Sequence, residues 1–187
     1  ECDRLGGKTR FLTGINDYMF DWALAPSEEF CAPEAVMCFA PDEDALSARM
    51  HAFVSEHIVR GKWKKRERPV LFNNWDGTYF DFNEEKLAAL MDDAAELGVD
   101  MFLLDDGWFG NKHPRHNDTQ GLGDWDETRG KLPGGIAGLV ETAEGKGIRF
   151  GLWIEPEMVN PRSELYEKHR DWVLRYPNRD EAYFRNQ

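Results

Sequence analysis

The alternation of short apolar strands with amphipathic helices in the second half of the chain places the strongest constraint on its fold. Three apolar segments have the length of buried strands: residues 70–73, 99–104 and 148–154. Between them, one helical pattern begins after the capping residue Asn83 and stops at Gly98, and a second ends near Gly147. A third helix is expected to begin after Pro161. Apolar strands separated by helices indicate right-handed βαβ units and a parallel sheet.

Three such units do not complete a domain, because an open three-stranded parallel sheet leaves bare edges and uncovered apolar faces. A closed eight-stranded barrel requires roughly 250 residues, whereas this chain has 187. The sequence therefore predicts the α/β class, with the first three β/α units of a (β/α)₈ TIM barrel over residues 69–187. The chain is expected to be a piece of a larger protein.

The first 41 residues follow a different pattern. Residues 8–40 are predicted to be β structure, because Tyr18, Phe20 and Trp22 alternate with other residues at the period of a half-buried strand. We therefore assign residues 1–41 to the end of a β domain that precedes the barrel.

A linking segment is predicted between these two parts, over residues 42–68. Leu46, Met50 and Phe53 recur at helical spacing and predict an amphipathic helix over residues 42–60. The basic run that follows is predicted to be a solvated linker.

Charge and composition exclude several kinds of partner. The formal net charge of −12 argues against a nucleic acid or an anionic membrane, since phosphate binding needs a basic surface. No run of about eighteen apolar residues is present. Cys2, Cys31 and Cys38 lack zinc spacing, and the last two are predicted to be small core residues rather than disulfide partners. This cysteine usage fits a cytoplasmic location.

Polar and aromatic side chains gather where each predicted strand ends. These residues are Asn73, Asn74, Trp75, Asp105, Asp106, Trp108, Trp153, Glu155 and Glu157. The carboxyl ends of parallel strands share one edge, where α/β folds bind ligands. Ionised carboxylates accept strong hydrogen bonds from hydroxyls, and indole rings pack against the apolar face of a pyranose. The pattern favours a sugar ligand.

Other interpretations of the same residues stay open. "DDG" is also turn chemistry, and Trp75 or Trp153 could simply pack in the core. A metal site at His113, His116 and Asp118 is conceivable, although such histidines in a polar loop are more often solvated. The spacing of Glu155 and Glu157 by itself permits a catalytic role.

Four longer motifs together resemble glycoside hydrolase family 36, in particular its bacterial-type α-galactosidases. They are "NNWDGTYFDFNEEKL", "LGVDMFLLDDGWFG", "LGDWDETRGKLPGGIAGL" and "GLWIEPEMVNPRSELYEKHRDW". The resemblance implies an N-terminal β-supersandwich, a (β/α)₈ barrel and a C-terminal β domain. It implies hydrolysis, with retention, of terminal α-linked galactose from oligosaccharides such as melibiose and raffinose.

The resemblance also assigns substrate-binding residues: Trp75, Asp105, Asp106, Trp153 and Arg185. It implies no catalytic residue in this chain, because the family's Lys-Trp-Asp motif with its nucleophile is missing and is expected beyond Gln187, as is the acid/base residue. The fragment alone is therefore predicted to be inactive. No cofactor and no metal are implied, and the complete protein is expected to be a homo-oligomer, a tetramer.

One segment departs from the pattern of the family, and other functions remain as alternatives. The loop 111–121 is unusual in sequence and is expected to affect which aglycone is accepted. An α-N-acetylgalactosaminidase or a raffinose-synthase-like transglycosidase of the same clan would share these motifs. A non-catalytic sugar-binding fragment is the alternative from a different functional class.

Overall fold

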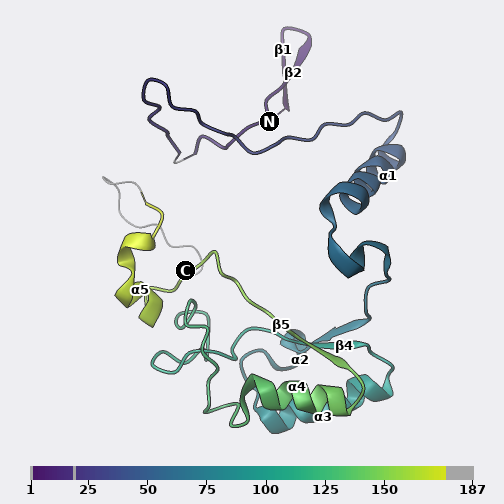
Figure 1. Ribbon diagram of the computed structural model, residues 1–187, viewed down its shortest axis with the longest axis vertical. Helices are drawn as coiled ribbons and strands as arrows, with labels where there is room; N and C mark the ends of the chain where they lie inside the picture. Colours follow the sequence, from purple (N-terminus) through teal and green to yellow (C-terminus); the bar gives the residue numbers. More distant parts are fainter. Residues whose placement is uncertain (1, 19, 176–187) are drawn as a thin grey trace. The chain divides into compact units, whose positions relative to one another are not determined.

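The computed structural model describes residues 2–18 and 20–175. The chain divides into two compact units, Glu1–Glu67 and Arg68–Gln187 (Figure 1). In the part of the chain so described, no helix is both long enough and apolar enough to cross a membrane.

The first unit opens with a β-hairpin of two antiparallel strands, β1 (Cys2–Leu5) and β2 (Lys8–Phe11). After it, the described residues up to Asp42 form neither helix nor strand. The prediction of β structure over residues 8–40 is therefore confirmed at β2 and wrong for the described residues that follow it. Trp22 is 60% exposed and contacts only the ring of Phe30 among aromatic neighbours described, with centroids 4.9 Å apart. Within residues 2–18 and 20–67, no facing sheet packs against the alternating aromatics, and pattern alone does not form a strand.

The prediction that Cys31 and Cys38 are core residues is also wrong. Cys31 is exposed and Cys38 is only half-buried, and both are free thiols. A core position requires neighbouring apolar groups on all sides, which this segment does not provide.

The predicted linking helix is confirmed as α1 (Glu43–Phe53), with Asp42 as its N-cap accepting a 2.8 Å hydrogen bond from the backbone N–H of Ala45. The helix continues through one π-helical turn, η1 (Val54–Ile58). A 3₁₀ segment, η2 (Gly61–Lys65), occupies the basic run. No residue of α1 is buried, so the apolar stripe finds no core within this unit.

The second unit contains the predicted parallel sheet. Its strands β3 (Leu71–Asn73), β4 (Met101–Leu104) and β5 (Arg149–Leu152) lie in that order. The register aligns Phe72, Phe102 and Phe150 across the sheet. Their rings are in contact, with centroids 5.6 Å and 6.5 Å apart, and Phe102 is fully buried.

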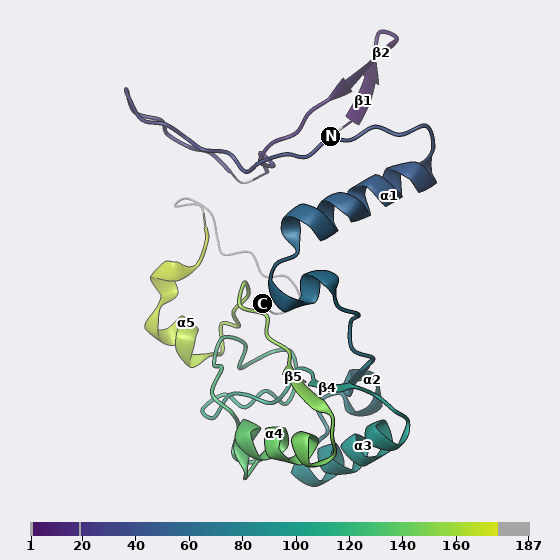
Figure 2. The same ribbon diagram turned by 45° about the vertical axis from the view of Figure 1, so that its right-hand side comes forward.

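Two longer helices cover one face of this sheet (Figures 1 and 2). They are α3 (Glu84–Glu96) and α4 (Gly135–Gly145), which pack against each other. Asn83 is the N-cap of α3, as predicted, and accepts from the backbone N–H of Lys86 at 2.9 Å. Beyond α3 the chain turns at Gly98, whose φ of 78° an L side chain rarely adopts.

Three shorter elements complete the unit. α2 (Trp75–Thr78) directly follows β3. The helix predicted after Pro161 is only the short α5 (Glu164–Lys168), capped by Ser163, and is followed by the 3₁₀ turn η3 (Arg170–Trp172).

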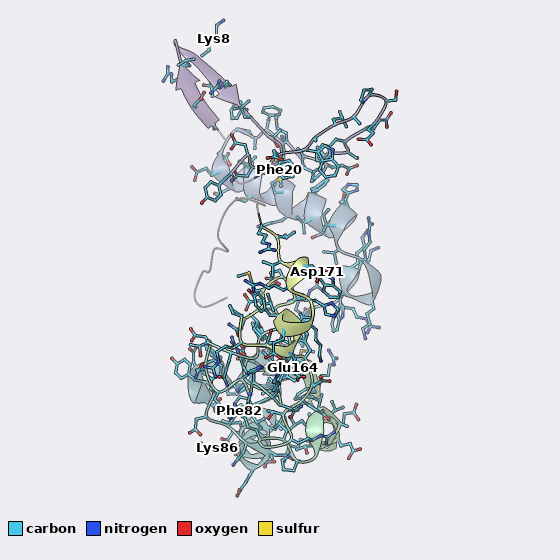
Figure 3. All side chains as sticks on the ribbon, turned by 90° about the vertical axis from the view of Figure 1, so that its left-hand side faces the viewer. Lys8, Phe20, Phe82, Lys86, Glu164 and Asp171 are labelled. Atoms are coloured by element: carbon cyan, nitrogen blue, oxygen red, sulfur yellow. The ribbon has the colours of Figure 1, made fainter. Side chains whose placement is uncertain are left out.

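The core lies between the helices and the sheet. It includes Leu87, Met91 and Ala94 of α3, Leu139 and Ala143 of α4, and Phe102 and Leu104 of β4. Phe82, just before α3, also belongs to it, whereas Lys86 lies at the surface (Figure 3).

The segment between β4 and α4 is more than the polar loop that its composition predicts. Phe109, Leu122 and Leu132 are fully buried and belong to the same core. The segment therefore packs against the core near the carboxyl ends of the strands.

Candidate functional site

An open pocket of about 470 Å³ lies at the carboxyl ends of the three parallel strands. It is lined by Trp75, Phe80, Asp105, Asp106, Arg115, Asp118, Trp153, Ile154, Glu155 and Glu157. Four of the five predicted substrate-binding residues are therefore brought together, from segments that follow β3, β4 and β5. The fifth, Arg185, lies outside the described residues.

Asp105 is held by Asn73, which ends β3, and by Asn74, which follows it. Its carboxylate accepts from Asn73 Nδ2 at 2.5 Å and from the backbone N–H of Asp106 at 2.7 Å. Its own backbone N–H donates to Asn74 Oδ1 at 2.8 Å. Because Asn74 is fully buried and its amide also donates to Thr78 Oγ1, the first carboxylate has a fixed position at the mouth of the sheet.

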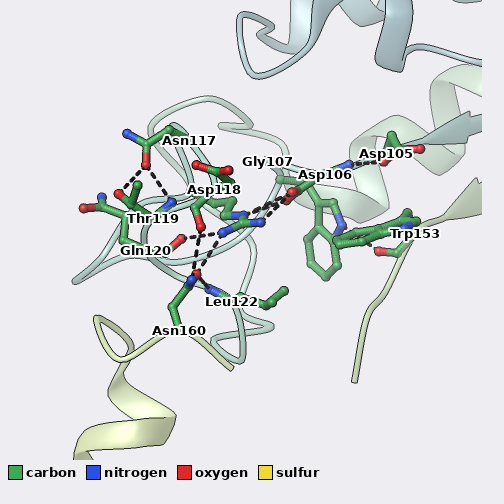
Figure 4. Close-up of polar contacts among 12 residues, drawn as sticks. Asp105, Asp106, Gly107, Asn117, Asp118, Thr119, Gln120, Leu122, Trp153 and Asn160 are labelled. Carbon is green, nitrogen blue, oxygen red and sulfur yellow. Dashed lines mark hydrogen bonds and ion pairs between the residues drawn. The ribbon is translucent and has the colours of Figure 1, made fainter. Parts of the chain in front are cut away.

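Asp106 is held by a different partner, the guanidinium of Arg115. Nε of Arg115 lies 2.9 Å from Oδ1 and 3.1 Å from Oδ2, and Nη2 lies 2.7 Å from Oδ2. The Asp106 side chain is 9% exposed and that of Arg115 is 1% exposed. This is a buried bidentate ion pair whose carboxylate still borders the pocket (Figure 4).

Arg115 is fixed from several directions. Its Nη1 donates to the backbone oxygen of Gln120 at 3.0 Å and to Asn160 Oδ1 at 2.8 Å. The guanidinium carbon also lies 5.7 Å from the ring centroid of Phe80 and 5.8 Å from that of Phe109, within the range of cation–π attraction.

The loop around Arg115 is tightly closed. Gly121 has a φ of 85°, and a Cβ there would come within 2.5 Å of the backbone oxygen of His113. Only glycine fits at such a position. The loop 111–121 is thus packed around its arginine rather than free in solvent.

Trp153 is oriented by an aromatic group beneath the pocket. Its ring lies nearly parallel to Phe109 at 6.5 Å and at 64° to Trp125 at 6.2 Å. Its backbone oxygen accepts from the indole nitrogen of Trp108 at 3.0 Å. Trp108 thus lies behind the pocket, 4% exposed, and acts as a support for Trp153.

Trp75 opens α2 and meets Tyr79 and Phe80 edge to face, with centroids 5.2 Å and 5.0 Å away. Tyr79 has a φ of 46°, which is strained for a bulky residue. This backbone turn brings Phe80 into the pocket lining beside Trp75.

Lys131 closes the back of the site. Its Nζ donates to the backbone oxygens of Phe80 and Gly107, both at 2.9 Å, and of Arg115 at 3.3 Å. Desolvation by burial lowers the pKa of Lys131 to about 8, against the opposing charges of Asp106 and Asp81. One half-buried cation therefore ties together the segments that follow β3 and β4.

The loop 111–121 is also attached to α5 by hydrogen bonds to Glu167. The carboxylate of Glu167 lies 2.5 Å from Lys112 Nζ and 2.9 Å from His113 Nε2. These hydrogen bonds hold the pKa of Glu167 below its usual range.

Among residues 2–18 and 20–175, no group of three or more His, Cys, Asp or Glu side chains could hold a metal ion, so the metal alternative at His113, His116 and Asp118 gains no support there.

Sequence reasoning missed Arg115, Phe80 and Lys131. Arg115 lies in "HPRHND", whose polar composition suggests a solvated loop. No local sequence pattern predicts that its side chain pairs with Asp106. Phe80 and Lys131 likewise carry no periodic signal. Their roles arise from contacts across 9 to 51 positions of chain.

The fold and pocket define a class: a parallel α/β unit with carboxylates and tryptophans at the carboxyl ends of its strands. The Melibiase family profile matches residues 29–187. The chain is 48% identical to the α-galactosidase AgaA of Geobacillus stearothermophilus over 100% of its length and 25% of that protein. It is 44% identical to an α-galactosidase of Lactobacillus acidophilus, over 97% of this chain and 24% of that one.

Solved structures agree with these sequence relatives. A crystal structure of AgaA matches with a TM-score of 0.72 and 50% identity, over 76% of this chain and 20% of that one. A variant of AgaA in complex with stachyose matches with a TM-score of 0.82 and 48% identity, over 92% and 24%. The chain belongs to the Melibiase family. Its structural neighbours are glycoside hydrolase family 36 α-galactosidases, which are TIM-barrel proteins, and it spans about a quarter of the length of these relatives.

Proposed function

We propose that this chain forms one side of the galactose pocket of a retaining α-galactosidase. The enzyme would hydrolyse terminal α-linked galactose from oligosaccharides such as melibiose and raffinose. The observation that carries this proposal is that one pocket is lined by Trp75, Asp105, Asp106 and Trp153 together. Relatives at 48% and 44% identity are named α-galactosidases, and AgaA variants are described in complex with raffinose and with stachyose.

The geometry suits binding rather than bond cleavage. Asp105 and Asp106 would accept hydrogen bonds from neighbouring galactose hydroxyls, and Trp75 and Trp153 would pack against the apolar face of the ring. Such contacts away from the reacting bond orient the sugar for attack. In a retaining enzyme, a carboxylate then attacks the anomeric carbon, a carboxylic acid protonates the leaving oxygen, and water hydrolyses the covalent galactosyl intermediate.

We assign neither of these two catalytic carboxyl groups to this chain. Glu155 and Glu157 border the pocket, but the resemblance assigns both roles to residues beyond Gln187. The 187-residue chain by itself is therefore expected to show no turnover.

We also propose that β3, β4 and β5 are the first three strands of an eight-stranded barrel, and that residues 1–41 end a β-sandwich domain. Support comes from the consecutive parallel order of the strands, their crossover helices α3 and α4, and a pocket at their carboxyl ends. Residues 42–68 would link the two. A cytoplasmic location, a tetrameric assembly and a role for Arg185 in binding the sugar stay predictions.

A chimaera tests the proposed function. This chain would replace the matching quarter of AgaA, and hydrolysis of p-nitrophenyl α-galactoside and melibiose would be measured. Activity within about tenfold of AgaA is expected, because the binding contacts orient the sugar as in the parent. A folded chimaera without activity would refute the proposal.

The same chimaera separates the clan alternatives. Turnover of an N-acetylgalactosaminide in preference to melibiose would indicate the first alternative. Transfer of galactose to an added acceptor sugar in preference to water would indicate the transglycosidase.

A further inference from the structure

Asp105 and Asp106 differ in the partners that hold them: within residues 2–18 and 20–175, a cation pairs at close range with Asp106 and not with Asp105. Asp105 is held by an amide and a backbone N–H, whereas both oxygens of Asp106 accept from Arg115 at 2.7 to 3.1 Å. A carboxylate offers about four acceptor positions. The bidentate contact therefore orients the Asp106 carboxylate while leaving acceptor capacity for a ligand.

Arg115 has little capacity to touch a ligand itself. Its side chain is almost fully buried. Of its five N–H donors, the single Nε–H and at least one on Nη2 serve Asp106, and both on Nη1 serve Gln120 and Asn160. Its contacts are thus directed at the groups that surround the pocket.

Asn160, which accepts a hydrogen bond from Arg115, belongs to the segment between β5 and α5. It is fully buried. Its Oδ1 accepts from Arg115 and, at 2.9 Å, from the backbone N–H of Leu122, and its Nδ2 donates to the backbone oxygen of Asp118 at 3.1 Å. Figure 4 shows this network running from Asn160 to Asp106.

We propose that Arg115 is a positioning residue for galactoside binding, which acts by fixing the Asp106 carboxylate, with Asn160 fixing Arg115 in turn. The inference rests on the proposed function, since it needs Asp106 to grip the sugar. The loop 111–121 would thus do more than affect which aglycone is accepted. It would carry the arginine that orients the sugar-binding carboxylate toward its ligand. An error of about 1 Å in such a carboxylate is enough to cost roughly a hundredfold in rate.

A purely structural ion pair would behave differently. Its loss would lower the thermal midpoint but leave kcat/KM of the folded protein unchanged. The decisive readouts are therefore kcat, KM and the competitive inhibition constant of galactose, measured well below the thermal midpoint of each variant.

The experiment uses the active AgaA chimaera that carries this chain. For Arg115→Met, we expect kcat/KM to fall about a hundredfold and galactose inhibition to weaken in parallel. Arg115→Lys keeps the charge without the planar fork and is expected to recover about a tenth of the activity. Arg129→Met is the matched control, because Arg129 lies in the same β4–α4 connection and pairs with Glu127 at the surface.

A double variant gives a further readout. The double variant Arg115→Met with Asp106→Asn is expected to have a kcat/KM no lower than that of the less active single variant. The reason is that the losses caused by two coupled residues are not additive. If Arg115→Met fails to fold, Asn160→Ala takes its place, with an expected loss of about tenfold in kcat/KM.

The outcomes separate the two proposals. A folded chimaera that is inactive before any substitution refutes the proposed function and this inference with it. An active chimaera in which the folded Arg115→Met variant, or Asn160→Ala in its place, changes kcat/KM by less than about threefold refutes the inference alone. Additive losses in the double variant would also overturn it.

Discussion

The two units contain similar apolar material but use it in opposite ways. In the second unit, Phe102 of β4 is fully buried between the neighbouring rings of Phe72 and Phe150. In the first unit, Trp22 stands in an equally regular alternation and stays 60% exposed. The difference teaches that periodicity marks which face a segment can bury, while burial itself requires a second element of the chain within reach.

The largest expected effect tests this contrast in the core. Phe102→Ala should lower the free energy of unfolding by about 3–5 kcal/mol, because it removes a ring from a packed interior and leaves a cavity. Trp22→Ala should change it by no more than about 0.5 kcal/mol. Denaturant unfolding of the chain, followed by far-UV circular dichroism, measures both, and equal effects would contradict the contrast.

Ion pairs provide the second comparison. Asp106→Asn should destabilise the second unit by about 3–5 kcal/mol, because it leaves the buried Arg115 without a compensating charge. Asp3→Asn removes the partner of Arg10, whose side chain is 54% exposed, and should cost at most about 1 kcal/mol. Thermal unfolding of the two variants side by side is the measurement. A larger loss for Asp3→Asn would mean that the first unit has a cooperative structure.

Helix caps give a smaller effect. Asn83 and Asp42 cap α3 and α1 with the same geometry, each accepting a backbone hydrogen bond at 2.8 to 2.9 Å. Asn83→Ala should cost about 1 kcal/mol in the unfolding of the second unit, since α3 contributes to its core. Asp42→Ala should reduce local helicity without shifting that transition. Amide hydrogen exchange resolved by segment distinguishes the two results.

The pH dependence of stability sharpens the description of the second unit. Burial lowers the pKa of Lys131 in the folded state to about 8 from its usual value of 10.5. Between these values the unfolded chain binds more protons, so the contribution of Lys131 makes stability rise with pH. Its destabilising effect is fully present below pH 8. Unfolding from pH 7 to 11 should show this rise, and Lys131→Met should remove it; a stability that falls identically in both proteins would contradict the assignment.

Much of the second unit could be predicted because its signals are local. Asn83 caps α3, Gly98 ends the turn after it, and the three apolar segments form β3, β4 and β5 within two residues of the expected bounds. The gathering of Trp75, Asp105, Asp106 and Trp153 followed from the rule that parallel strands end at one edge. Tyr18, Phe20 and Trp22 gave an equally clear local signal, but the described residues of the first unit contain no sheet against which these rings could pack.

The sequence by itself determined the order and kind of elements in the second unit, and which residues would meet at the ends of its strands. The reason is that hydrophobic period, capping and strand alternation act over a few neighbouring residues. Only the tertiary structure decided that Arg115 would hold Asp106, that Lys131 would bridge three backbone oxygens, and that Phe109, Leu122 and Leu132 of a polar loop would belong to the core. Those contacts depend on how a 30-residue connection, residues 105–134, closes over the sheet, and closure is set by packing between distant segments.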